Sequence, residues 1–296
     1  MLTFPSALPW MVGFWLCVHA YLAVNGRGAW VPLVICLTIL VLKLVPRTPV
    51  VLMFGLVLAI VIYSRFKQDR LPKILARPTF SSAVVLIAWA CLLLHWRMIE
   101  NCSHTNVLDI SRPVVCVGDS LTDGLLPDHG YPEPLKAMIT MPVINLGFSG
   151  ISTSQGLGQM ERVLSHDPQV VVIELGGHDF LKGHGRATAK ANLIKMIDQS
   201  REAGADVVLM EIPRGFMFDP YASLEREIAY EKDVQLVSDT WLRQIVLLSP
   251  IAPPGKWFPS LQLSDDGIHS NPKGSQAIAR RVADAIHSMY GPRSKT

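Results

Sequence analysis

The chain has 296 residues, of which 50% are hydrophobic and only 17% are charged, and its formal net charge is +3. A charged fraction so far below the usual quarter, with a positive mean hydropathy, indicates membrane-spanning segments. Residues 1–98 contain nine Lys and Arg and one acidic residue, whereas residues 99–296 contain eighteen Lys and Arg and twenty-three acidic residues. The longer part is therefore mildly acidic, and the net charge gives no support for nucleic acid binding by it.

Four apolar runs, each of about 17 residues, follow one another in the first third of the chain. As helices they would each be about 26 Å long, close to the ~30 Å thickness of the hydrocarbon core. No Lys or Arg precedes the first run, whereas a cleaved signal peptide normally begins with a positive segment, so we expect this run to be retained. We predict a membrane region over residues 1–98 with about four helices, at 8–24, 30–46, 48–64 and 81–97.

The charges between the apolar runs predict the orientation in the membrane. Segment 65–78 contains five Lys and Arg and a single acidic residue, which places it in the cytoplasm. The fourth helix then carries the chain outward, so we expect a multi-pass membrane protein with residues 99–296 in the periplasm or outside the cell. Lys43 and Arg47 give a weaker opposing signal. A hydrophobic anchor that does not span the bilayer, with the domain in the cytoplasm, is the alternative.

From residue 113 the sequence alternates between short apolar runs and helical patterns. The runs 113–120, 142–147, 169–177 and 205–213 are continuously apolar, which is typical of strands buried on both faces of a sheet. This alternation predicts one α/β domain over residues 99–296, with a parallel sheet covered by helices. The helical patterns lie at 132–140, 154–165, 187–203, 222–236, 239–248 and 272–289, the last with Asn271 as its cap.

Two of the five cysteines lie in or near this domain. Cys116 lies in the middle of an expected strand, where a small buried thiol is the usual finding. A disulfide with Cys102 is the alternative, but the strand would have to bend to allow it.

Side chains that could take part in catalysis follow the ends of the predicted strands, where functional groups of a parallel sheet gather. Ser120 follows the first strand, Gly150 lies after the second, and Asp266 and His269 share the last such loop. Acyl transfer needs a hydroxyl nucleophile, an imidazole base held by a carboxylate, and N–H donors for the oxyanion. Each piece alone has a simpler explanation, since Ser120 could cap a helix and Asp266 could form a surface pair with His269. Together they predict a triad with Ser120 and Gly150 as oxyanion donors.

Four motifs lie in this order along the domain: GDSL at 118–121, NLGFSGISTSQGL at 145–157, ELGGHD at 174–179 and DDGIHSN at 265–271. With them the domain resembles the SGNH (GDSL) hydrolases, and among them the thioesterase I, lysophospholipase and arylesterase type. This resemblance covers about residues 113–290 and implies a three-layer α/β/α, flavodoxin-like fold that uses no cofactor. It also implies Ser120 as the nucleophile, Asp266 and His269 as the other triad members, and the N–H groups of Ser120 and Gly150 as oxyanion donors. No metal is expected, because no Cys or His spacing forms a good metal site.

One position departs from the family pattern. The family has Gly-x-Asn-Asp in its third motif, whereas this chain has His178 before Asp179. The family's Asn amide donates a hydrogen bond to the oxyanion, and the ring N–H of His178 could do so with a different reach. We therefore expect an active hydrolase with His178 in an altered oxyanion hole, and Asp179 as a structural residue that bonds the loop backbone.

These features predict a membrane-anchored serine esterase that cleaves acyl esters or thioesters, such as those of lysophospholipids. One alternative is an enzyme that transfers or removes acyl groups on cell-envelope glycans. Another is a non-catalytic scaffold with the SGNH fold, because His178 replaces the family Asn. Two apolar segments, 214–221 and 257–259, are candidates to line an acyl pocket or simply to pack.

Overall fold

The computed structural model describes part of the chain, and all the described residues belong to one compact unit, Ile99–Thr296. They are 107–125, 130–212, 214, 221, 224–238, 263–266 and 268–290. Within these ranges no helix is both long enough and apolar enough to cross a bilayer. The predictions for the membrane region 1–98, Cys102, helix 239–248, segment 257–259 and most of 214–221 lie outside the described residues.

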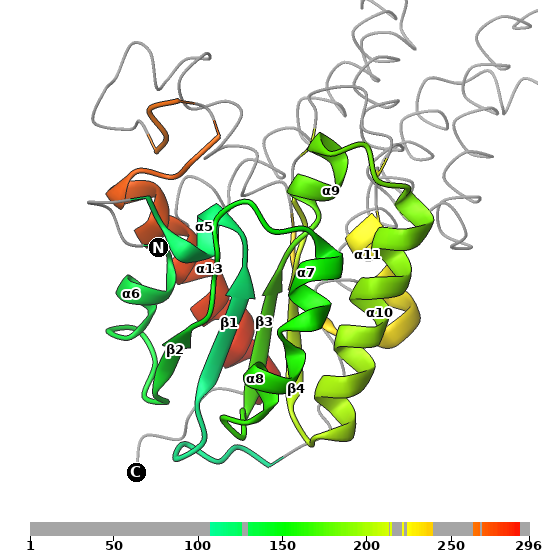
Figure 1. Ribbon diagram of the computed structural model, residues 1–296. Coiled ribbons are helices and arrows are strands. Elements are labelled where there is room, and N and C mark those ends of the chain that lie inside the picture. Colours follow the sequence, from blue (N-terminus) through cyan, green and yellow to red (C-terminus); the bar gives the residue numbers. More distant parts are fainter. Residues whose placement is uncertain are drawn as a thin grey trace, which may run out of the picture. The chain divides into compact units, whose positions relative to one another are not determined.

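A five-stranded parallel sheet forms the centre of the domain (Figure 1). The strand order is β2-β1-β3-β4-β5, which is the flavodoxin-like order with its switch point between β1 and β3. The four strands predicted from apolar runs are confirmed, and every residue of β1 and β3 is buried. The strands are β1 Val114–Gly118, β2 Val143–Asn145, β3 Val170–Glu174, β4 Asp206–Met210 and β5 Gln235–Val237.

Helices cover both faces of the sheet, with α7, α8 and α10 in front of it and α13 behind it in the view of Figure 1. Successive strand residues point to opposite faces, so Cys116 and Val172 share the face that packs in one core with Ile278 and Val282 of α13. The helices are α5 Ser120–Asp123, α6 Pro132–Leu135, α7 Thr153–Gly158, α8 Met160–Leu164, α9 Gly177–Leu181, α10 Arg186–Glu202, α11 Leu224–Lys232 and α13 Pro272–Tyr290.

The helix expected at 222–236 was only partly right. It ends at Lys232, and Asp233 takes a left-handed backbone conformation with φ of 48° that breaks the helix. The next residues form β5, a strand of three residues whose Leu236 pairs with Leu209 of β4. A strand this short is too brief for its periodicity to be recognised in the sequence.

Two other predictions about local structure differ in detail from the outcome. The pattern at 154–165 corresponds to two short helices, α7 and α8, and α6 ends at Leu135 although the pattern extends to 140. The expected start of the last helix is confirmed, because the side chain of Asn271 accepts a hydrogen bond from the N–H of Gly274. Cys116 is a free, buried thiol, and burial raises its pKa to about 12.

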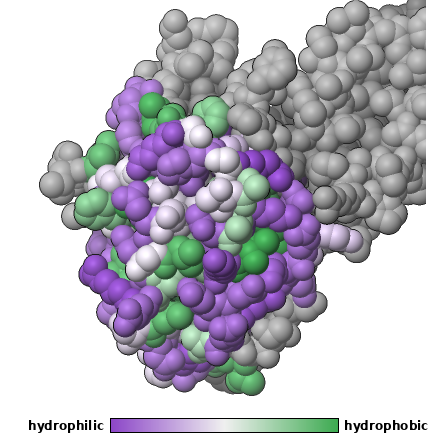
Figure 2. Space-filling view, turned by 45° about the vertical axis from the view of Figure 1, so that its right-hand side comes forward, coloured by the Kyte–Doolittle hydropathy of each residue, from purple (hydrophilic) through white to green (hydrophobic). Residues whose placement is uncertain are grey.

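The surface of the described part is largely polar on the face shown in Figure 2. Hydrophilic residues predominate there, and hydrophobic residues form small separate patches among them. A sheet covered by helices on both faces leaves the loops at the strand ends as the place for a functional site.

Candidate active site

Ser120 begins α5 directly after β1, at the carboxyl end of the sheet and next to the switch point. Its neighbour Asp119 caps the helix by accepting a hydrogen bond from the N–H of Leu121 at 3.3 Å. The residue is 8% exposed, so it is mostly covered but not sealed from solvent. The backbone N–H of Ser120 donates to no acceptor among the described residues, as expected for the first turn of a helix.

A buried carboxyl group that the sequence analysis missed supports the Ser120 loop. Glu174, at the end of β3, is fully buried, and its Oε2 accepts hydrogen bonds from the N–H of Asp119 at 3.0 Å and Oγ1 of Thr122 at 2.9 Å. Burial, and then the nearby Asp119 carboxyl, raise the pKa of Glu174 well above its usual range. The available signal was an acidic residue that ends an otherwise continuous apolar run.

Asp266 and His269 are brought together as predicted. Nδ1 of His269 lies 2.6 Å from Oδ2 of Asp266, and Oδ1 of Asp266 accepts the N–H groups of His269 at 2.7 Å and Ile268 at 2.8 Å. Partial burial raises the pKa of Asp266, but these hydrogen bonds outweigh it and lower the pKa to about 2. Asp266 is therefore a carboxylate at neutral pH, suited to holding a proton on Nδ1 of the imidazole.

The third member of the predicted triad is not hydrogen-bonded to this pair. Among the described residues no hydrogen bond joins Oγ of Ser120 to His269. Burial raises the pKa of Asp119, and the imidazoles of His178 and His269 partly offset this rise, so both rings lie within electrostatic reach of the residue beside Ser120. Catalytic hydrogen bonds are often long in proteins without substrate, so the triad stays a prediction on this geometry.

The loop after β2 is attached to the helix that begins with Ser120. Ser149 donates to Oδ2 of Asp123 through its N–H at 2.9 Å and its Oγ at 2.6 Å, and the side-chain amide of Asn145 donates to the carbonyl of Thr122 at 2.9 Å. The next residue, Gly150, has a φ of 83°, a left-handed conformation that favours glycine. Its N–H donates to no acceptor among the described residues.

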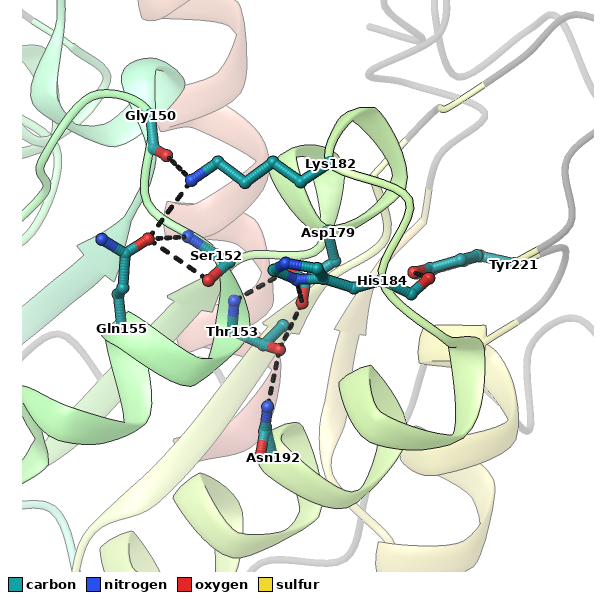
Figure 3. Close-up of polar contacts among 9 residues, drawn as sticks. All are labelled: Gly150, Ser152, Thr153, Gln155, Asp179, Lys182, His184, Asn192 and Tyr221. Carbon is teal, nitrogen blue, oxygen red and sulfur yellow. Dashed lines mark hydrogen bonds and ion pairs between the residues drawn. The ribbon is translucent and has the colours of Figure 1, made fainter.

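The third motif forms α9, where His178 is half-buried in the first turn. No described residue hydrogen-bonds its imidazole, so the ring is available to a substrate. Asp179 is fully buried, and its carboxylate accepts the N–H of Thr153 at 2.7 Å and Oγ1 of Thr153 at 2.8 Å, with Nδ1 of His184 at 3.2 Å (Figure 3). The expected structural role of Asp179 is thus confirmed, since it ties α9 to α7.

A buried ion pair under α9 was also missed. The guanidinium of Arg214 donates to both carboxylate oxygens of Glu225, at 2.6 and 2.8 Å, and the two side chains are 2% and 0% exposed. A Cβ on Gly176 would lie only 2.8 Å from Nη1 of Arg214, so the pair packs directly against the loop that leads to His178. The partners are eleven positions apart in the sequence, and no short motif marks them.

Comparison with known proteins covers this same part of the chain. The model of the GDSL-like Lipase/Acylhydrolase family matches residues 116–277. The arylesterase of Vibrio mimicus is 30% identical over 189 residues, which are 60% of this chain and 88% of that protein. Thioesterase 1/protease 1/lysophospholipase L1 of Escherichia coli K12 is 27% identical over 186 residues, or 60% and 84% of the two chains. The crystal structure of TesA, 24% identical, superposes with a TM-score of 0.51 over 60% of this chain and 99% of its own.

Proposed function

The chain belongs to the GDSL-like lipase/acylhydrolase family and is a hydrolase of ester bonds, and from this premise we propose that it cleaves acyl esters or thioesters with Ser120 as its nucleophile. The observation that carries the proposal is the Asp266–His269 pair, with 2.6 Å between Oδ2 and Nδ1. An imidazole held in this way can accept a proton at its other nitrogen, which is the property that a serine nucleophile requires.

The proposed reaction has two halves. His269 takes the proton of Ser120 through Nε2 as Oγ attacks the carbonyl carbon of the ester, and the bond to the leaving alcohol or thiol then breaks as His269 returns the proton to it. Water attacks the resulting acyl-serine with the same base, which releases the acid and restores the Ser120 hydroxyl. Asp266 stays ionised throughout and stabilises the imidazolium.

Three groups are proposed to bind the oxyanion that forms in each half. The N–H groups of Ser120 and Gly150 have no acceptor among the described residues, and the imidazole of His178 has no partner there. Hydrogen-bond donors that are already in position and unpaired stabilise the transition state most when negative charge develops on the substrate oxygen. This supports an active enzyme in which the ring N–H of His178 replaces the side-chain amide of the family Asn as a donor to the oxyanion.

The exposed apolar side chains around the site support an apolar acyl group as part of the substrate. Three loops and the end of α9, all following the carboxyl ends of the strands or preceding α13, each carry one such residue, and the four are between 44% and 68% exposed. They are Leu125, Phe148, Leu181 and Ile268. The predicted membrane helices of residues 1–98 would hold such a site close to lipid, and we propose that the protein is membrane-anchored with its hydrolase domain outside the cytoplasm.

An esterase assay tests the proposal. The full chain should hydrolyse p-nitrophenyl butyrate, and Ser120→Ala should reduce the rate at least about a thousandfold, because the nucleophile is lost. Ser165→Ala, which removes an exposed hydroxyl at the end of α8, should leave the rate unchanged. A folded protein without activity, or one equally active without the Ser120 hydroxyl, would instead support a non-catalytic scaffold.

A further inference from the structure

The side chain of Lys182 reaches from the end of α9 to the loop after β2. Its Nζ donates to the carbonyl oxygen of Gly150 at 2.8 Å and to Oε1 of Gln155 at 3.3 Å. Figure 3 shows the extended lysine side chain ending between these two oxygens. The contact joins the segment that carries His178 to the segment that carries Gly150, which are separate in the sequence.

Gly150 is the third residue of a tight turn in which the N–H of Ile151 donates to the carbonyl of Phe148 at 3.3 Å. A Cβ on Gly150 would meet no atom within 4 Å, so hydrogen bonds rather than side-chain packing hold its left-handed conformation. The residue before it, Ser149, is bound to Asp123 of α5 by two hydrogen bonds. The N-terminal side of Gly150 is therefore anchored to the helix of Ser120, and Lys182 anchors its carbonyl.

The second acceptor of Lys182 is itself fixed. Oε1 of Gln155 also accepts hydrogen bonds from the N–H of Ser152 at 3.0 Å and from Oγ of Ser152 at 3.2 Å, in the capping box that begins α7. The ammonium of Lys182 is thus bound both to a side-chain oxygen of this capping box and to the carbonyl oxygen of Gly150. A hydrogen bond from a charged donor is also stronger than one between neutral groups.

We propose that Lys182 is a positioning residue that sets the direction of the Gly150 N–H toward the oxyanion. Holding the carbonyl of Gly150 while Ser149 is tied to α5 fixes the dihedral angles on both sides of the glycine, and with them the peptide plane that carries this N–H. The inference rests on the proposed function, in which Gly150 is an oxyanion donor. It goes beyond that function because it assigns Lys182 a role exerted through Gly150.

A residue with this role should affect the transition state more than substrate binding. We expect Lys182→Met, which keeps the length and loses the charge and donors, to lower kcat about tenfold with little change in KM. This is less than the 10²–10³-fold typical of deleting an oxyanion donor, since the N–H remains but is no longer held. Lys182→Arg can still donate to both oxygens and should retain most of the activity.

The test measures kcat and KM of the full chain with p-nitrophenyl butyrate, together with inhibition by a trifluoromethyl ketone that forms an oxyanion on binding. Affinity for the ketone should fall in parallel with kcat in Lys182→Met and recover in Lys182→Arg. The control is Lys136→Met, an exposed lysine 2.6 Å from Glu133, which should behave as wild type. Thermal unfolding of each variant separates a folding defect from a catalytic one.

The outcomes distinguish a failure of the role of Lys182 from a failure of the proposed esterase function. An active wild type whose activity depends on Ser120, with kcat and ketone affinity unchanged in Lys182→Met, overturns the role of Lys182 alone. An equal loss of kcat in Lys182→Arg also overturns it. So does a loss of kcat in Lys182→Met that is explained by a lower unfolding temperature. A wild type that does not hydrolyse the ester and does not bind the ketone overturns the proposed function itself, and the inference with it.

Discussion

At the scale of single residues, His178 is where this chain departs from its family. Its imidazole is half-buried, lies in the first turn of α9 and has no hydrogen-bond partner among the described residues. Asp179, the next residue, is fully buried and bonded to Thr153, so the segment that carries His178 is firmly held. A ring on a fixed backbone can serve as a donor if its N–H reaches the oxyanion.

We expect His178→Ala to lower kcat by about 10²-fold, because one oxyanion donor is lost while two backbone donors remain. His178→Asn, which restores the family residue, should keep much more activity than His178→Ala. Steady-state kinetics with a p-nitrophenyl ester measures both variants. Equal activity of His178→Ala and wild type would show that the ring makes no contact in the transition state.

Glu174 is a second residue with a specific prediction, because burial raises the pKa of its carboxyl. Its pKa in the folded protein lies well above the value near 4.5 expected when the chain is unfolded. The folded state therefore binds more protons than the unfolded state above pH 4.5, and the free energy of unfolding should fall as pH rises. Glu174→Gln keeps the shape without the titration.

The difference in unfolding free energy between Glu174→Gln and wild type should shift in favour of the variant between pH 5 and pH 8. Denaturant unfolding at the two pH values measures it. The exposed Glu161 of α8 provides the control, since Glu161→Gln should follow wild type at both pH values. A constant difference for Glu174→Gln would mean that the buried carboxyl does not resist ionisation.

At the scale of elements, the ion pair of Arg214 with Glu225 links α11 to the loop after β4, and it packs against Gly176 in the loop before α9. Both side chains are buried, and Arg214→Met removes two hydrogen bonds that a guanidinium donates to the Glu225 carboxylate in the interior. We expect Arg214→Met to reduce the free energy of unfolding by about 3–5 kcal/mol, and the double variant with Glu225→Met to lose much less. Denaturant unfolding of the two variants measures this, and equal losses would show that the pair is not coupled.

The elements also show which features of a sequence carry information about structure. Continuous apolar runs located β1, β3 and β4 because strands buried on both faces show no alternation. The edge strand β2 is only partly buried, and its short apolar run also located it. β5 was missed because three residues at the edge of a sheet show no period, and α11 precedes it with only Asp233 as a break. The pair of Arg214 and Glu225 was missed because contacts between distant residues leave no local signal.

At the scale of the whole molecule, the parts of the site come from loops that are far apart in sequence but lie at one edge of the sheet. Ser120 follows β1, Gly150 follows β2 and His178 follows β3, as a strand order with a switch point between β1 and β3 requires. The motifs predicted this arrangement because loops after parallel strands share an edge. They could not predict the supports of the site, Glu174 and Lys182, since those depend on side-chain contacts across loops.

Covalent labelling with a fluorophosphonate, with the modified peptide identified by mass spectrometry, tests the triad most directly. The full chain should be labelled on Ser120 and on no other serine of the domain. His269→Ala should slow that labelling by orders of magnitude, because the hydroxyl loses its base, while Asp266→Asn should slow it as well. A folded chain that is not labelled at Ser120, or that is labelled as fast without the His269 imidazole, would contradict the account.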